Sequence, residues 1–145
     1  MHTHGTGGSD FMNGMVEDIL TDSRMHLMHG TTTICSASAA STDEDLSAFL
    51  DCCEQSKSIR ENMPHLADTR LEGPYFSPAQ AGAQQPECMK QPTFPGSLFA
   101  RLERGCGNIV RWSSASEVSG IIELGDILNQ RGILPSIAHT MPTAT

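Results

Sequence analysis

HGTTTICSASAASTDEDLSAFL, residues 29–50, contains the end of one helix, a whole strand and the start of a second helix. Gly30 is the residue type that most often follows a helix, because glycine adopts the left-handed conformation without strain. β-branched residues dominate 31–38, which predicts a buried strand. Ser41 and Glu44 have the spacing of a capping box, and leucine and phenylalanine recur at helical spacing after it. A strand followed closely by a helix indicates an α/β protein.

The same alternation continues on both sides of this stretch. Apolar residues at helical spacing predict helices, and β-branched runs predict strands. A Pro-, Gln- and Gly-rich segment, 78–96, is too irregular for a regular element and is predicted to be a long loop, of a kind that is usually functional or disordered. The other predicted elements are helices over 15–29, 97–104 and 121–130 and strands over 65–77, 108–116 and 133–139.

Alternating elements joined by short connections indicate a parallel sheet with right-handed crossovers. Two architectures fit this order, a doubly wound sheet and part of a (β/α)₈ barrel. The dinucleotide-binding version of the first has no support, because no GxGxxG lies between a strand and a helix. Periodicity alone does not separate the two architectures.

The composition is that of one ordinary globular domain. The chain has 145 residues with 38% hydrophobic and 18% charged residues, and its net charge is -8. Without a cluster of Lys and Arg, a nucleic-acid backbone and an anionic membrane surface are not expected partners. The sequence also contains no apolar run of the roughly 20 residues that a membrane span needs, and its start does not resemble a signal peptide. We therefore expect a cytoplasmic protein. The five cysteines form an odd set without CxxC spacing, and we expect them to be packing residues.

Histidine and glutamate side chains fall where a parallel α/β protein places its ligands. His2 and His4 would share one face of an extended segment, because residues two apart in a strand point to the same side. Glu72 ends the predicted strand over 65–72, and His139 closes the last one. The carboxyl ends of parallel strands meet at one edge, and imidazole and carboxylate are zinc ligands. The pattern predicts a metal site. Each residue also has a simpler interpretation: a frayed terminus, a solvated turn or a satisfied core histidine.

The remaining histidines carry less weight. His26 and His29 lie one turn apart on a polar helix face and are predicted to be solvated. His65 precedes a strand and has no acidic or cysteine residue near it in the sequence. Arg70 is unexpected, because it would share a strand face with Glu72.

Four motifs carry a resemblance to a known family. The sequence has HTHG at 2–5, HGTTT at 29–33, LEGPYFSPAQAGAQ at 71–84 and ILPSIAHT at 133–140. In this order and at these distances, the motifs resemble the N-acetylglucosamine-6-phosphate deacetylases of the amidohydrolase superfamily. The LEGPYFSP…GAQ block is the most specific of the four. The resemblance covers nearly the whole chain.

The resemblance implies a fold, a site and a ligand. Residues 1–145 would be the N-terminal portion of the family's barrel, a partial (β/α)₈ TIM-type fold with about the first five parallel strands and their helices. A divalent metal, Zn²⁺ or alternatively Fe²⁺, would be bound by His2, His4, Glu72 and His139. Ala83 and Gln84 would contact the sugar phosphate. Metal-activated water would then hydrolyse the acetamide to glucosamine 6-phosphate and acetate. The complete enzyme would be a homodimer.

The sequence also departs from the family. Arg70 stands where the family usually has histidine, Ser116 where proline is common, and Met141 where asparagine or aspartate usually follows. The next histidine ligand and the catalytic aspartate belong to later strands of the family's barrel, so no catalytic residue is assigned here. Two alternatives stay open: an inert fragment or pseudoenzyme, and another amidohydrolase that acts on a different amide or a cyclic imide. The LEGPYFSP…GAQ block favours the sugar-phosphate branch over the second.

Overall fold

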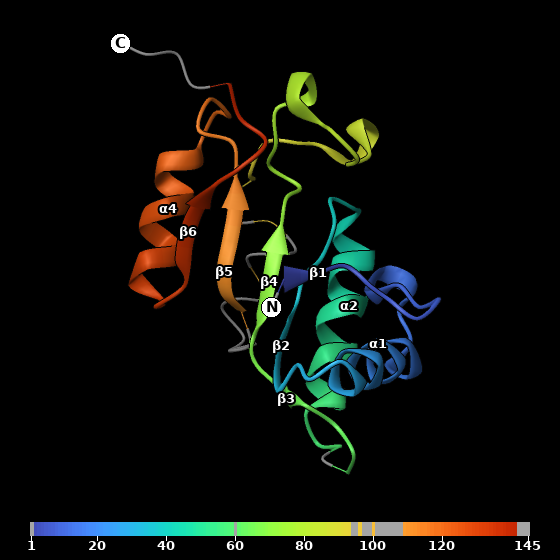
Figure 1. The fold of residues 1–145 in the computed structure, drawn as a ribbon. Helices are drawn as coiled ribbons and strands as arrows, with labels where there is room; N and C mark the ends of the chain where they lie inside the picture. Colours follow the sequence, from blue (N-terminus) through green and yellow to red (C-terminus); the bar gives the residue numbers. More distant parts are fainter. Residues whose placement is uncertain (1, 60, 94–95, 97–99, 101–108, 142–145) are drawn as a thin grey trace.

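The computed structural model describes residues 2–59, 61–93, 96, 100 and 109–141, and in them strands and helices alternate along the chain (Figure 1). The strands are β1 (His2–Thr3), β2 (Thr33–Ser36), β3 (His65–Leu66), β4 (Thr69–Glu72), β5 (Ile109–Ser114) and β6 (Leu134–Ile137). The α-helices are α1 (Val16–Met28), α2 (Asp43–Ser56) and α4 (Ile121–Gln130), and the 3₁₀ helices are η1 (Phe11–Asn13), η2 (Pro78–Gln80) and η3 (Pro86–Cys88).

All strand pairs are parallel, and the strands form two sheets with the orders β1-β2-β3 and β4-β5-β6. β3 and β4 follow one another in a single extended segment, so the sheets are joined through it. β2 pairs with β3 near its start, and a bridge from Ala37 to Arg70 then connects the residue after β2 to β4. Neighbouring strands therefore follow the order of the chain throughout. The predicted α/β class with a parallel sheet is confirmed.

One hydrophobic core connects both sheets to their helices. In Figure 1, α1 and α2 lie beside β1 and β2, whereas α4 lies beside β6. The core's largest fully buried side chains include Trp112, Phe11, Phe49, Leu71 and Leu124. Burying each such side chain contributes roughly 1.5–3 kcal/mol. The indole Nε1 of Trp112 also donates a hydrogen bond to the carbonyl of Gly73 at 2.9 Å, which satisfies its polar atom inside the core.

Several element boundaries differ from the predicted ones. The cap of α2 is Thr42, whose hydroxyl accepts a hydrogen bond from the Asp45 amide, so the predicted capping box is shifted by one residue. The strand predicted over 65–77 is interrupted after β3 and ends at Glu72. The long loop contains η2 and η3, each with proline near its start, where the missing amide hydrogen costs nothing. The helix predicted over 97–104 falls on residues that, except for residue 100, lie outside the described ones.

The described cysteines are buried or half-buried, as expected of packing residues. Cys52 and Cys53 are buried on the inner face of α2, and Cys35 and Cys88 are half-buried; Cys106 lies outside the described residues. Within the described part of the chain, no helix is both long and apolar enough to cross a bilayer.

Candidate functional site

Glu72 is held at the carboxyl end of β4 by hydrogen bonds on both sides of the strand. Its amide donates to the Ser38 hydroxyl at 3.0 Å, and the next amide, of Gly73, donates to the Ser113 carbonyl at 3.1 Å. Gly73 adopts a φ of 85°, a left-handed conformation in which glycine turns the chain away from the sheet without strain. The Glu72 residue is only 7% exposed. The strand thus ends in a buried carboxylate of fixed position.

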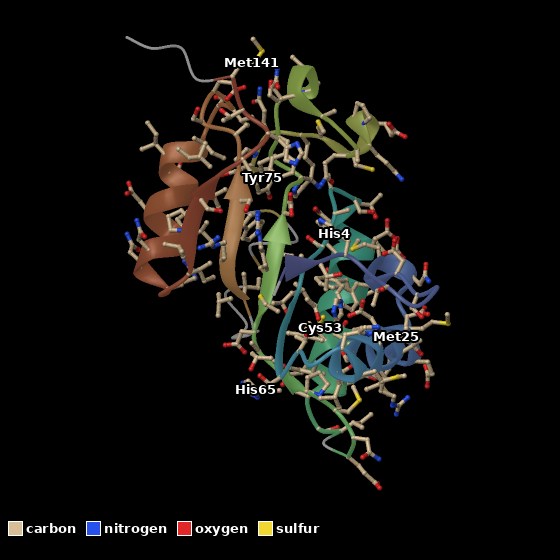
Figure 2. All side chains as sticks on the ribbon, in the orientation of Figure 1. His4, Met25, Cys53, His65, Tyr75 and Met141 are labelled. Atoms are coloured by element: carbon tan, nitrogen blue, oxygen red, sulfur yellow. The ribbon has the colours of Figure 1, made fainter. Side chains whose placement is uncertain are left out.

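Three side chains that can carry positive charge converge on this carboxylate. His4 Nε2 lies 3.4 Å from Glu72 Oε2, and His139 Nε2 lies 3.4 Å from Oε1. Arg70 Nη2 lies 3.7 Å from Oε2. Figure 2 shows His4 beside the short β1, which it follows directly in the chain. His4, Glu72 and His139, which are far apart in the sequence, therefore meet at one point, as the strand-end rule predicts.

Glu72 alters the titration of His4. The hydrogen bond to the Glu72 carboxylate raises the pKa of His4 above its usual 6.5, while partial burial of the ring opposes this rise. The negative charge of Glu72, the Ala37 backbone and Asp10 add to the increase. The protonated form of His4 is thus favoured beside a buried carboxylate.

The ring of His139 is oriented by the loop after β4. Its Nδ1 lies 2.9 Å from the Gln80 carbonyl, which can only accept, so Nδ1 carries the hydrogen in this contact. The Phe76 ring packs on the imidazole with 4.5 Å between ring centroids. A Cβ on Gly82 would lie 3.6 Å from His139 Cε1, so the loop passes directly over the ring. These contacts hold the ring with Nε2 directed at Glu72 Oε1.

Ala83 and Gln84 lie in the same loop, away from Glu72's immediate contacts. Ala83 is exposed, and Gln84 is half-buried. The Gln84 side-chain Oε1 accepts a hydrogen bond from the Ala40 amide at 2.6 Å, and the Gln84 amide donates to the Ala81 carbonyl at 3.0 Å. The loop is thereby fastened to the segment after β2, and the side-chain NH₂ group of Gln84 is the group that it can offer to a ligand.

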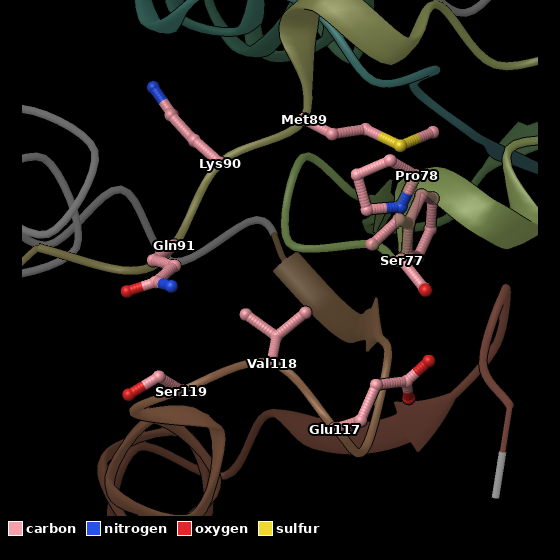
Figure 3. Close-up of a pocket in the computed structure, with 9 residues that line it drawn as sticks. Ser77, Pro78, Met89, Lys90, Gln91, Glu117, Val118 and Ser119 are labelled. Atoms are coloured by element: carbon pink, nitrogen blue, oxygen red, sulfur yellow. The ribbon is translucent and has the colours of Figure 1, made fainter.

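A pocket of about 430 Å³ lies between the loop after β4 and the loop after β5 (Figure 3). Phe76, which packs on His139, forms part of its wall. Lys90, at its rim, forms an ion pair with Asp43. The remaining lining residues are Ser77, Pro78, Met89, Gln91, Glu117, Val118 and Ser119.

The donor types at Glu72 fit a divalent metal. Two imidazoles and a carboxylate form a familiar zinc ligand set. In its neutral form with the hydrogen on Nδ1, His139 would offer its Nε2 lone pair beside Glu72 Oε1, where a cation could contact both atoms. As the described side chains stand, however, no group of three or more His, Cys, Asp or Glu is arranged to hold an ion. The side chain of His2 is not among the described ones; its backbone pairs with Cys35 in β1.

A second buried carboxylate, Asp22 on α1, was not predicted. Asp22 is fully buried, and His26 Nε2, one turn later, lies 3.6 Å from its Oδ1. Burial raises the Asp22 pKa to about 6, while His26 and the backbone of Thr6 oppose this rise. The prediction that His26 is solvated is therefore wrong. The spacing of Asp22 and His26 was visible in the sequence, but the glycine-rich loop that covers them was not expected to pack there; a Cβ on Gly7 would lie 2.5 Å from Met25 Cγ.

Known proteins resemble the chain in sequence and in structure, although no family model matches it. The N-acetylglucosamine-6-phosphate deacetylase of Bacillus subtilis (strain 168) is 26% identical over 144 residues, which cover 97% of this chain and 36% of that protein. The crystal structure of the N-acetyl-D-glucosamine-6-phosphate deacetylase from Mycobacterium smegmatis matches with a TM-score of 0.87 and 27% identity, over 99% of this chain and 36% of that one.

A mutant of the Mycobacterium smegmatis enzyme in complex with N-acetyl-D-glucosamine-6-phosphate matches with a TM-score of 0.85 and 27% identity, again over 36% of its length. The present chain thus spans about a third of the proteins that it matches. The resemblance seen in the four sequence motifs is confirmed: along nearly all of its length, the chain is similar to one part of proteins that are N-acetylglucosamine-6-phosphate deacetylases, which are hydrolases.

Proposed function

We propose that the chain supplies part of the metal site and part of the sugar-phosphate loop of a metal-dependent deacetylase, which converts N-acetylglucosamine 6-phosphate to glucosamine 6-phosphate and acetate. The observation that carries this proposal is the convergence of His4 and His139 on the two oxygens of buried Glu72. The relatives that the chain matches are named for this reaction.

The proposed architecture is the first five strands of a (β/α)₈ barrel. Parallel strands in chain order support it, and so does the Ala37–Arg70 bridge, which continues the strand order from one sheet to the next. A doubly wound sheet would instead reverse its strand order at a switch point. Within the barrel, the site lies at the carboxyl ends of the strands, where catalytic groups are found in this architecture.

Glu72 and His139 would hold the metal, Zn²⁺ or alternatively Fe²⁺, with His2 and His4 as the further ligands. When bound, the metal would lower the pKa of a water molecule and polarise the acetyl carbonyl. The chain's own residues prepare this site. The Gln80 carbonyl fixes the tautomer of His139, Phe76 holds the plane of its ring, and Ser38 fixes the backbone of Glu72.

Ala83 and Gln84 would bind the sugar phosphate. The Gln84 NH₂ group can donate to a phosphate or hydroxyl oxygen, whereas its Oε1 is already bonded to Ala40. Such a loop would favour ligands that present acceptor atoms. The phosphate of the substrate fits this requirement.

The test combines metal binding with turnover. The purified chain is titrated with Zn²⁺ by calorimetry, and acetate is measured after incubation with N-acetylglucosamine 6-phosphate or with unphosphorylated N-acetylglucosamine. We expect Zn²⁺ binding that Glu72→Gln and His139→Ala abolish and Glu61→Gln, an exposed control, leaves intact. Turnover by this chain should be lower by about 10²–10⁴-fold than a complete enzyme's, because the family's proton-transferring aspartate lies in later strands.

Each alternative has its own result. Zn²⁺ binding that does not depend on Glu72 would contradict the proposed site and favour an inert fragment. Acetate release from the unphosphorylated sugar at an equal rate would favour an amidohydrolase for a different amide.

A further inference from the structure

The backbone of His139 adopts an uncommon conformation at the proposed site. Its φ is 48°, in the left-handed region that residues other than glycine seldom adopt. Such a conformation is unfavourable by itself and persists only where surrounding contacts hold it. The contacts that hold the backbone here therefore also set the position of the ring, whose Nε2 lies 3.4 Å from Glu72 Oε1. This inference rests on the proposed function, in which His139 is a site residue.

Up to His139, the chain is held by neighbours on two sides. The Ala138 amide donates a hydrogen bond to the Ser114 carbonyl of β5 at 3.0 Å, and the Ser77 amide donates to the His139 carbonyl at 3.2 Å. Because these bonds lie before and at His139, they do not fix the direction in which the chain leaves it. The residues that follow must be held separately.

Glu117, on the loop after β5, holds the residues that follow His139. Its Oε1 accepts a hydrogen bond from the Met141 amide at 2.8 Å, and its Oε2 accepts one from the Thr140 hydroxyl. The Ser77 hydroxyl also bonds to this carboxylate, and Figure 3 shows Ser77 and Glu117 on the same side of the pocket. A carboxylate makes stronger hydrogen bonds than a neutral acceptor does. One side chain thus connects the chain after β6 to the loops after β4 and β5.

Thr140 is held from a second direction by Ser116. The Thr140 hydroxyl gives its one hydrogen to Glu117, so its oxygen accepts from the Ser116 amide at 3.1 Å. The Ser116 hydroxyl lies 2.8 Å from the same oxygen. Proline, which is common at position 116 in the family that the chain resembles, has no amide hydrogen and could not make the first of these bonds. A change of φ at His139 would move Thr140 away from both partners.

We propose that Glu117 is a positioning residue for His139. By holding the two residues that follow, it keeps the His139 backbone in the left-handed conformation and directs the ring Nε2 at Glu72. Glu117 acts on the site through the backbone and contributes no atom to it. Because Glu117 is exposed, this role can be lost while the overall stability changes little.

The experiment follows the His139 ring by NMR in the full chain, without metal. The centroid of the Phe76 ring lies 4.5 Å from that of the imidazole, so its ring current displaces the chemical shifts of the His139 ring protons from their values in the unfolded chain. We expect Glu117→Ala to lose most of this displacement and Thr140→Val to lose part of it. Glu117→Gln keeps an oxygen that can accept a hydrogen bond and should retain more of the displacement than alanine does. Glu123→Ala, at an exposed glutamate of α4, is the matched control and should leave the shifts unchanged.

Unchanged His139 ring protons in a folded Glu117→Ala protein would overturn the proposal. So would changes of similar size at the Trp112 indole protons, because they would indicate a general disturbance of the core instead of a local effect at His139. Thermal melting verifies the fold of each variant, and Thr140→Val serves if Glu117→Ala does not fold.

Zn²⁺ titration of the same proteins tests the proposed function separately. Displacement of the His139 ring should lower the Zn²⁺ affinity of Glu117→Ala by about 10–100-fold. Zn²⁺ binding that is absent from the wild type, or that a displaced ring leaves unchanged, would overturn the proposed metal site and leave the role of Glu117 standing.

Discussion

Glu72 and Asp22 are both buried carboxylates with a histidine beside them, yet their surroundings differ. Glu72 ends a strand and has Arg70, His4 and His139 around its two oxygens. Asp22 lies in the middle of α1 and has His26, at 3.6 Å, as its ion-pair partner. Burial raises the Asp22 pKa to about 6. Burial alone therefore does not make a carboxylate functional: Glu72 has three side chains that can carry positive charge beside its two oxygens, whereas Asp22 has one, and ionising Asp22 in its buried position costs stability.

The largest expected effect is that of Glu72→Gln. The variant should lose at least about 100-fold in Zn²⁺ affinity, because the removed oxygen charge is the anionic ligand of the proposed site. Its free energy of unfolding should also fall by about 2 kcal/mol, which lowers the urea midpoint, because Arg70 and His4 lose their shared counter-ion. Calorimetry and urea denaturation measure the two effects. Stability equal to that of the Glu61→Gln control would show that Glu72 does not balance these charges.

The next largest effect, of opposite sign, is expected from Asp22→Asn. The folded pKa of about 6 lies above the usual 3.8, so the folded state holds the proton more tightly, and wild-type stability falls as the pH rises through this window. Asparagine removes that loss. The variant should match the wild type below pH 4 and exceed it at pH 7 by up to about 3 kcal/mol. Urea denaturation from pH 4 to 7 tests this; a constant difference across the range would contradict it.

A smaller effect is expected from His26→Gln. Removing the imidazole beside Asp22 Oδ1 should raise the Asp22 pKa further, because the charge of His26 currently lowers it. The variant should be less stable near pH 6 by about 0.5 kcal/mol. NMR titration of the Asp22 carboxyl carbon measures the pKa directly. In the double variant with Asp22→Asn, the cost of losing His26 should disappear, and a persistent cost would show that His26 acts through packing instead.

The smallest effect is expected at an exposed carboxylate, Glu117. Hydrogen bonds from the Thr140 hydroxyl and the Met141 amide lower its pKa to about 2. The stability that they provide is present above the usual 4.5 and is lost as the pH falls toward 2. Glu117→Gln should therefore alter the unfolding midpoint only slightly, and the difference should shrink as the pH falls from 4.5 toward 2. Water screens an exposed group, so we expect a much smaller change in stability than at buried Asp22. A change as large as that of Asp22→Asn would show that burial does not determine the size of the effect.

The sequence predicted those helices and strands that depend on residues close together in the chain. The helix over 121–130 has the predicted bounds, and the strands of 31–38, 108–116 and 133–139 contain β2, β5 and β6. The shift of the α2 cap from Ser41 to Thr42 is a matter of one residue, since both side chains can cap a helix; Ser41 instead donates to the Asp45 carboxylate at 2.6 Å.

The features that the sequence did not predict depend on contacts between segments that lie far apart in the chain. The meeting of His4, Glu72 and His139 could be expected, because parallel topology brings strand ends together. Their exact partners could not. The Gln80 carbonyl that orients His139 comes from a loop without periodicity, and the burial of Asp22 depends on how the glycine-rich loop packs over α1. In a helix, Asp22 and His26 by themselves have the spacing of an ordinary solvated pair.

The hydrogen bond from the Ala40 amide to Gln84 Oε1 makes this amide a natural reporter of events in the loop. Ala40 is only 3% exposed, so its amide would lack a water partner if Gln84 turned away. Leaving such a group unpaired costs about 1–3 kcal/mol. A ligand that engages only the NH₂ group tightens the existing bond and should slow hydrogen–deuterium exchange at Ala40. A ligand that competes for the carbonyl oxygen should accelerate exchange there, so one resonance distinguishes the two modes of binding.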